Sequence, residues 1–187
     1  MPDPPDILIR SLTSADVAKV RELHDLVLPL KYPTSFFVQL LLQSDRVCLA
    51  AYGSANPTSP IAFISASLRQ PVRSQGFHDG DQRLRETKDS PHIEILTLGV
   101  LPAYQHRGLA RLLIRRVYER LQEPSHKPRD QSDGTLLQAN VATSNIPALT
   151  FYERMGMRIA SDVIHNLYRS CRYGSRDGYL VAGVVYF

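Results

Sequence analysis

Residues 98–110, with the sequence LGVLPAYQHRGLA, decide the fold of this chain. An apolar strand ends near the proline, a short loop follows, and an amphipathic helix is predicted to begin at Gly108. The first N–H groups of a helix have no partner within the helix, so they readily bind phosphate. Gly108 and the small Ala110 let a pyrophosphate approach the backbone, and Arg107 and Arg111 add positive charge. This segment therefore predicts a site for a pyrophosphate-containing ligand.

The elements expected around this segment follow the order β-α-α-β-β-β-α-β-α-β-β. Strands are expected at residues 7–10, 47–52, 61–68, 92–101, 135–141, 158–164 and 178–186. Helices are expected at 15–28 with Ser14 as N-cap, at 36–41, at 108–121 and at 146–155 with Gly156 as the C-cap glycine. Loops are predicted at residues 53–60 and 123–134, and a flexible insertion at 69–91. The whole chain, 1–187, is expected to form a single α/β domain.

Composition excludes several classes of protein. Hydrophobic residues make up 43% and charged residues 21% of the chain, which is typical of a globular domain. No apolar run reaches the roughly 18 residues of a membrane span, and the N-terminus lacks a secretory signal pattern. Two isolated cysteines, Cys48 and Cys171, suit a reducing compartment, although a single disulfide stays open. We expect a cytoplasmic protein, or one that is also nuclear, with no membrane association.

The formal net charge of +4 is mildly basic. It suits a polyanionic cofactor or a ribosome surface, and it also falls within ordinary values for a soluble domain. It does not predict direct DNA binding. The sequence contains no Gly-x-Gly-x-x-Gly or Gly-Lys-Ser/Thr loop, and no cluster with metal-ligand spacing. A Rossmann site, a P-loop and a bound metal are therefore not expected.

Gln105-x-x-Gly108-x-Ala110 resembles the acetyl-CoA signature of the GNAT superfamily of N-acetyltransferases. Two further matches occur in the expected order, namely the strand at 97–100 before it and the segment 145–157 after it. The resemblance implies the GNAT fold, an α/β fold with a mixed sheet of about seven strands and four helices. It also implies that acetyl-CoA, with no metal, binds where strands 4 and 5 splay.

Two shorter segments resemble one branch of that superfamily. Residues 28–32, LPLKY, resemble the Phe-Pro-Val-x-Tyr segment of NatE-type N-terminal acetyltransferases, and residues 166–169, NLYR, resemble their Asn-Tyr-Tyr-Lys. This likeness implies acetylation of protein N-termini that start with Met followed by an apolar residue. An auxiliary subunit and the ribosome are then the expected partners. The implied substrate-binding residues are Leu28, Pro29, Leu30, Tyr32, Leu96, Leu167 and Tyr168.

The resemblance also assigns cofactor and catalytic roles. The implied acetyl-CoA-binding residues are Leu98, Gly99, Val100, Gln105, His106, Arg107, Gly108, Leu109, Ala110, Arg111, Asn145 and Tyr152. The Leu98 N–H would polarise the thioester carbonyl, and Tyr152 would act as the general acid. No cysteine lies at a matched position, so the acetyl group is expected to pass directly from donor to amine.

The chain departs from that branch at two catalytic positions. Where the branch has Tyr and His on its fourth and fifth strands, this sequence has Glu94 and Asn140. An α-amine has a pKa of about 8, so it must lose a proton before it attacks the thioester. We expect Glu94 to accept that proton through water and Asn140 to orient the water. His92, two residues earlier, is a weaker candidate for the base.

Two other functions remain open at this point. The acceptor can instead be a lysine side chain or a small amine, which needs a wider groove than the segment 28–32 suggests. The changes at Glu94 and Asn140 are also compatible with a degenerate GNAT that serves as a partner-binding subunit of a ribosome-associated complex.

Overall fold

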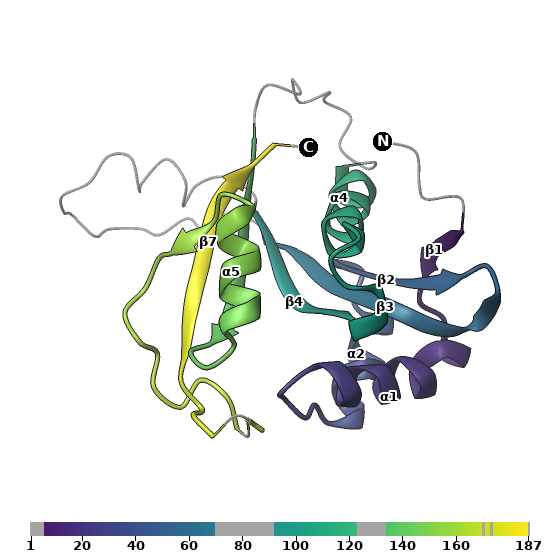
Figure 1. Ribbon diagram of the computed structural model, residues 1–187, viewed down its shortest axis with the longest axis horizontal. Helices are drawn as coiled ribbons and strands as arrows, with labels where there is room; N and C mark the ends of the chain where they lie inside the picture. Colours follow the sequence, from purple (N-terminus) through teal and green to yellow (C-terminus); the bar gives the residue numbers. More distant parts are fainter. Residues whose placement is uncertain (1–5, 70–91, 123–133, 170, 173, 187) are drawn as a thin grey trace.

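The computed structural model describes residues 6–69, 92–122, 134–169, 171–172 and 174–186 (Figure 1). The strands of this part form one seven-stranded sheet in the order β1-β2-β3-β4-β5-β7-β6. Neighbouring strands are antiparallel throughout, except for the central pair β4 and β5. The expected mixed α/β sheet of about seven strands is confirmed, and the structure shows that its fourth and fifth strands are parallel.

The strands and helices follow one another in the predicted order. The strands are β1 (Ile7–Ser11), β2 (Arg46–Gly53), β3 (Asn56–Arg69), β4 (His92–Val100), β5 (Thr135–Ala142), β6 (Arg158–Ile159) and β7 (Gly178–Val185). The α-helices are α1 (Val17–Val27), α2 (Thr34–Leu42), α4 (Leu109–Gln122) and α5 (Ile146–Arg154). Two short 3-10 turns, η1 (Ser14–Asp16) and η2 (Pro102–Tyr104), precede α1 and α4.

Helices cover both faces of the sheet, and each face has its own apolar cluster. Figure 1 shows α1 and α2 on one side of the β1–β4 half, and α4 on the other side. On the α4 side, Leu113, Ile114 and Val117 are almost fully buried and share a cluster with Tyr152 of α5. On the α1 side, the apolar residues of α1 and α2 form a second cluster with β2 and β3. The candidate site lies at the middle of the sheet, at strands β4 and β5.

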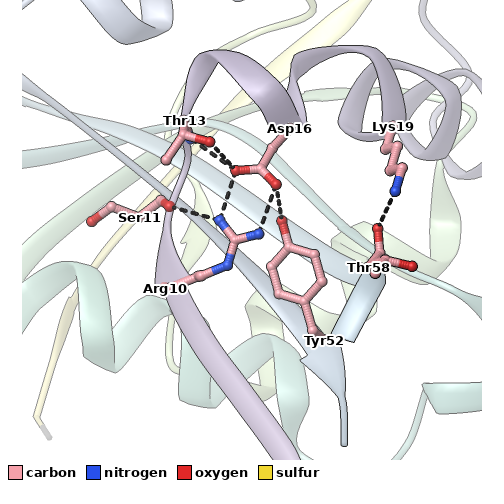
Figure 2. Close-up of polar contacts among 7 residues, drawn as sticks. All are labelled: Arg10, Ser11, Thr13, Asp16, Lys19, Tyr52 and Thr58. Atoms are coloured by element: carbon pink, nitrogen blue, oxygen red, sulfur yellow. Dashed lines mark hydrogen bonds and ion pairs between the residues drawn. The ribbon is translucent and has the colours of Figure 1, made fainter. Parts of the chain in front are cut away.

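A buried carboxylate anchors the start of α1 to the first two strands (Figure 2). Asp16 accepts hydrogen bonds from Arg10 at 2.6 and 2.7 Å and from the Tyr52 hydroxyl at 2.9 Å. It also accepts from the backbone N–H of Thr13 at 3.0 Å. The predicted N-cap at Ser14 is wrong, because a 3-10 turn capped at Thr13 precedes the α-helix, whose own N-cap is Asp16.

Two predicted boundaries are also wrong. β3 begins at Asn56, so the loop expected at 53–60 shrinks to two residues, because Gly53 pairs with Asn56 across an irregular register. β6 covers only two residues of the expected strand 158–164, and Ile164 forms an isolated bridge with Gly178. Of the expected insertion 69–91, Arg69 belongs to β3 and residues 70–91 lie outside the described part.

The loop expected at 123–134 lies outside the described part except for its last residue. No helix within the described ranges is long and apolar enough to cross a membrane.

Candidate active site

β4 and β5 separate part-way along their length, and the candidate site lies at this divergence. Their parallel pairing ends at Ile95 and Ala139, although both strands continue beyond these residues. On its other edge, β4 stays paired with β3 across a bulge that leaves Leu96 unpaired opposite Ser65 and Ala66. Beyond Ile95, β4 has no paired strand on its β5 side within the described residues. Its backbone polar groups there are open to a ligand.

A cavity of about 60 Å³ lies against the splayed strands. Its lining includes many of the predicted site residues, namely Leu28, Pro29, Leu30, Tyr32, Leu96, Leu98, Asn140, Asn145, Tyr152 and Tyr168. The lining residues that were not predicted are Ile95, Thr97, Val141, Ala142 and Ala148. Ile95, Thr97 and Val141 are adjacent to predicted residues, Ala142 is two residues from Asn140 on β5, and Ala148 is about one helical turn from Asn145 and Tyr152, so strand alternation and helix spacing could have found them. The structure thus brings four distant segments of the chain to one cavity.

Of the predicted catalytic and substrate-binding residues, Glu94 and Leu167 lie outside this lining. Glu94 is on the part of β4 that is still paired with β5, and its Oε2 accepts a hydrogen bond from Arg69 Nε at 2.5 Å. Its side chain is 24% exposed, so it remains accessible to water. Leu167 packs against β7, where its Cδ2 lies 2.5 Å from the position that a Cβ on Gly178 would take. The roles of Glu94 as base and of Leu167 as groove residue stay predictions.

Three tyrosines give the cavity its polar character. Burial raises the pKa of Tyr32 to about 12 and raises the pKa of Tyr152, which is 6% exposed. Burial also raises the pKa of Tyr168, and the nearby Tyr32 and Tyr152 hydroxyls and Cys171 thiol add to this effect. All three phenols therefore stay protonated near neutral pH and can donate hydrogen bonds. The described lining contains no carboxylate, imidazole or ammonium group.

The turn before α4 has the geometry of an anion site. The Gln105 amide donates to the Val100 carbonyl at 2.9 Å, which holds the turn against the end of β4. His106 and Gly108 have positive φ angles of 60° and 79°. Leu112 is the first residue whose N–H donates into the helix, to the Gly108 carbonyl at 3.0 Å. The N–H groups of the preceding turn are left to bind an anion.

The other residues predicted to bind the cofactor around the start of α4 differ in their exposure to solvent. Arg107 and Arg111 are exposed, whereas Leu109 is buried in the core and Ala110 is half-buried. Gly99 has no room for a side chain, because atoms of α1 and β3 lie within 2.7 Å of the place of a Cβ. Among these described residues, Arg107 and Arg111 carry the formally charged side chains that can reach a phosphate, and the backbone N–H groups of the turn add further contacts.

The two asparagines lie on opposite sides of the β5–α5 connection. Asn145 caps α5, because its Oδ1 accepts from the Ala148 N–H at 3.3 Å. This bond leaves the amide NH2 of Asn145 available at the cavity wall. Asn140 is exposed near the end of β5, where it pairs with Leu180 of β7. Both amides can orient a ligand or a water at the cavity.

The two loops that wall the cavity are joined by a backbone hydrogen bond. The Arg172 N–H, in the β6–β7 loop, donates to the Pro29 carbonyl, in the α1–α2 loop, at 2.7 Å. Within the β6–β7 loop, the Tyr168 N–H donates to the Arg176 carbonyl at 3.0 Å. The Asp177 carboxylate also accepts from the Asn166 N–H at 2.9 Å. These bonds fix Tyr168 over the cavity.

A sequence model of the acetyltransferase (GNAT) family matches residues 17–157. The chain belongs to this family. The histone acetyltransferase MCC1 of Arabidopsis thaliana is 30% identical to this GNAT acetyltransferase over 120 residues, which are 60% of the chain. The chain spans about half the length of that relative, since the match covers 47% of it.

Solved structures of other acetyltransferases share the fold. Arabidopsis thaliana NAA60 in complex with acetyl-CoA superposes with a TM-score of 0.71 at 24% identity, over 95% of this chain and 98% of the other. Arabidopsis thaliana Naa50 with the bisubstrate analogue CoA-Ac-MVNAL gives a TM-score of 0.66 at 18% identity, over 95% and 98%. The predicted GNAT fold is thus confirmed.

The structural neighbour NAA60 is in complex with acetyl-CoA, and the described residues of this chain suit that ligand in two places. The unpaired N–H groups and positive-φ glycine before α4 fit a pyrophosphate, with Arg107 and Arg111 beside them. The open edge of β4 beyond Ile95 suits the acetyl-bearing arm. Within the described ranges, no group of three or more His, Cys, Asp or Glu residues could hold a metal.

Proposed function

We propose that this acetyltransferase acetylates the α-amine of protein N-termini, with preference for Met followed by an apolar residue. The observation that carries the proposal is the joined pair of loops over the cavity. The Arg172–Pro29 hydrogen bond joins the two loops, and Pro29, Leu30 and Tyr168 line the cavity from them. A chain end can enter such a site, whereas a lysine within a continuous chain needs a groove that is open at both ends.

The character of the cavity supports an apolar first residue. The described lining carries no formal charge, and Leu28, Leu30 and Leu96 give it an apolar wall. The analogue bound to the structural neighbour Naa50 contains the peptide MVNAL, which begins with Met followed by an apolar residue. The fold shared with that enzyme makes the same acceptor class a reasonable substrate for this chain.

The chain supplies three groups for the reaction in this proposal. The amine loses its proton through water to Glu94, which lies on the α1 face of β4, two residues before Leu96 of the cavity. Asn140 orients that water from β5. Tyr152 gives its proton to the departing thiolate. Since burial raises the pKa of Tyr152, its proton is present up to at least about pH 10, and kcat is expected not to fall below that pH through its loss.

A panel of peptides tests both the acceptor and the roles of Glu94, Asn140 and Tyr152. CoA release is measured with peptides that start Met-Leu, Met-Lys, Ser or with an acidic residue, and with a blocked peptide that carries an internal lysine. We expect turnover on the free Met-starting peptides only. Glu94→Gln and Tyr152→Phe are each expected to lower kcat about 100-fold, with a smaller loss for Asn140→Ala. Wild-type turnover by Glu94→Gln would remove Glu94 from the mechanism, and turnover confined to Ser or acidic starts would remove the Met preference.

The relationship to MCC1 favours a second candidate acceptor. That relative is named a histone acetyltransferase and is 30% identical over 120 residues. If the blocked lysine peptide alone is acetylated, the acceptor is a lysine and the N-terminal proposal is overturned. If acetyl-CoA binds without turnover on any peptide, the chain is a partner-binding subunit or needs an auxiliary subunit. Size-exclusion chromatography with ribosomes then tests the expected ribosome association.

A further inference from the structure

The proposed base, Glu94, forms an ion pair with Arg69 of the neighbouring strand β3. Glu94 lies on β4 directly opposite Ser67 of β3, and Arg69, two residues further along β3, lies opposite His92. Arg69 Nε donates to Glu94 Oε2 at 2.5 Å, in a contact whose side chains are 48% and 24% exposed. The contact uses one carboxylate oxygen. The other oxygen, Oε1, accepts no hydrogen bond from any described residue.

The described residues that pair with this region of β3 and β4 carry no further carboxylate. From β2, Arg46 lies opposite Ser67, and its Nε and Nη1 are buried without a partner. The Ser67 hydroxyl is also buried without a partner, and so is Nδ1 of His92. From β5, the residue opposite Glu94 is the uncharged Gln138. Within these described positions Glu94 is the single carboxylate among two guanidinium groups.

We propose that Arg69 is a positioning residue for catalysis: its guanidinium holds Oε2 of Glu94 so that Oε1 is presented to the water that takes the proton from the amine. The inference rests on the proposed function, because it requires Glu94 to be the base. A charge-assisted hydrogen bond limits the rotation of a glutamate side chain that would otherwise sample several rotamers. A base that acts through water must keep one oxygen in place, because proton transfer depends on hydrogen-bond geometry.

A double-mutant cycle tests this role. We expect Arg69→Met to lower kcat about tenfold with little change in the KM for peptide or for acetyl-CoA, and Arg69→Lys to recover part of the loss. In the Glu94→Gln background, Arg69→Met is expected to cost no further activity, because the group it positions is already gone. Additive losses, a change confined to KM, or wild-type kcat in Arg69→Met would overturn the inference.

The chain offers a matched control. Arg115 Nε donates to Glu119 Oε1 at 2.9 Å on the surface of α4, with side-chain exposures of 39% and 36%. Arg115→Met breaks a comparable ion pair away from the cavity and is expected to leave kcat unchanged.

The failure of the proposal and that of the proposed function can be told apart. If Glu94→Gln is inactive and Arg69→Met is fully active, only the positioning role fails. If Glu94→Gln keeps wild-type kcat, Glu94 is not the base and the positioning role falls with it, whereas the peptide panel still decides the acceptor.

Discussion

The two halves of the site are built in different ways. The donor half, residues 98–112, is one continuous segment whose contacts come mainly from backbone groups before α4. The acceptor half is assembled from the α1–α2 loop, β4, β5, α5 and the β6–β7 loop, and it depends on side chains. Its two walls are joined by a hydrogen bond between residues 143 positions apart, Pro29 and Arg172 (172 − 29). Changes elsewhere in the molecule should therefore affect acetyl-CoA binding by the continuous donor segment less than peptide binding by the acceptor half, which several elements form together.

The largest expected difference between the two halves is their response to low pH, which depends on the buried side chain of His24. This side chain is 1% exposed behind the cavity wall, with its ring 4.7 Å from that of Tyr32 and 5.0 Å from that of Phe63. Burial lowers the pKa of His24 to about 4, and the nearby Asp25 opposes this only in part. An unfolded histidine titrates near pH 6.5. The stability that neutral His24 provides is therefore full above about pH 6.5 and is lost as the pH falls toward 4.

We expect the free energy of unfolding to fall by about 3 kcal/mol between pH 6.5 and 4, as measured by urea denaturation. The KM for peptide should rise in this range before the affinity for acetyl-CoA changes, because His24 packs against Tyr32 of the acceptor half. His24→Phe keeps a ring in place and should flatten the pH dependence. A slope that persists in this variant would assign the effect to other groups.

The same contrast explains what the sequence could predict. The strand end and the helix start on either side of the turn before α4 can be predicted, because a strand pattern, a glycine and an amphipathic pattern follow one another within a few residues, whereas the 3-10 turn η2 between them has no such signal. The cavity residues of the acceptor half came from resemblance, since nothing local links Leu28 to Tyr168. The direction of the Leu167 side chain cannot be predicted in this way, because the short β6 is followed by a loop and no strand alternation applies there.

Pairing between strands accounts for the other differences. The early start of β3 depends on an irregular register with β2, in which Tyr52 pairs with Pro60 and Gly53 with Asn56. Propensity argues against a strand at these proline-containing residues, and tertiary pairing overrides it. The contact between Arg69 and Glu94 likewise depends on the β3–β4 register, which cannot be derived from either strand alone.

Three glycines with positive φ and open surroundings allow a second comparison. Gly108 lies in the donor half at φ 79°, Gly174 in the β6–β7 loop at φ 92°, and Gly156 after α5 at φ 87°. A Cβ at any of them meets nothing within 4 Å, so alanine brings backbone strain of about 1–2 kcal/mol without a clash.

Gly108→Ala is expected to weaken acetyl-CoA binding about tenfold by calorimetry, because the strained turn no longer presents its N–H groups. Gly174→Ala should instead raise the KM for peptide, by a smaller factor, and leave acetyl-CoA binding unchanged. Gly156→Ala controls for strain alone and should lower only the melting temperature. Equal effects of Gly108→Ala and Gly174→Ala on both ligands would show that the halves are not independent.

The smallest effect is expected at the bond that joins the walls. Arg172→Pro removes the N–H that donates to Pro29, whereas Arg172→Ala removes the side chain and keeps the N–H. One hydrogen bond contributes about 1 kcal/mol, so the KM for peptide should rise about fivefold in Arg172→Pro, with the acetyl-CoA affinity unchanged. An equal rise in Arg172→Ala would assign the effect to the guanidinium. A proline variant with wild-type KM would mean that peptide binding already breaks this bond, so that the two loops separate when the substrate enters.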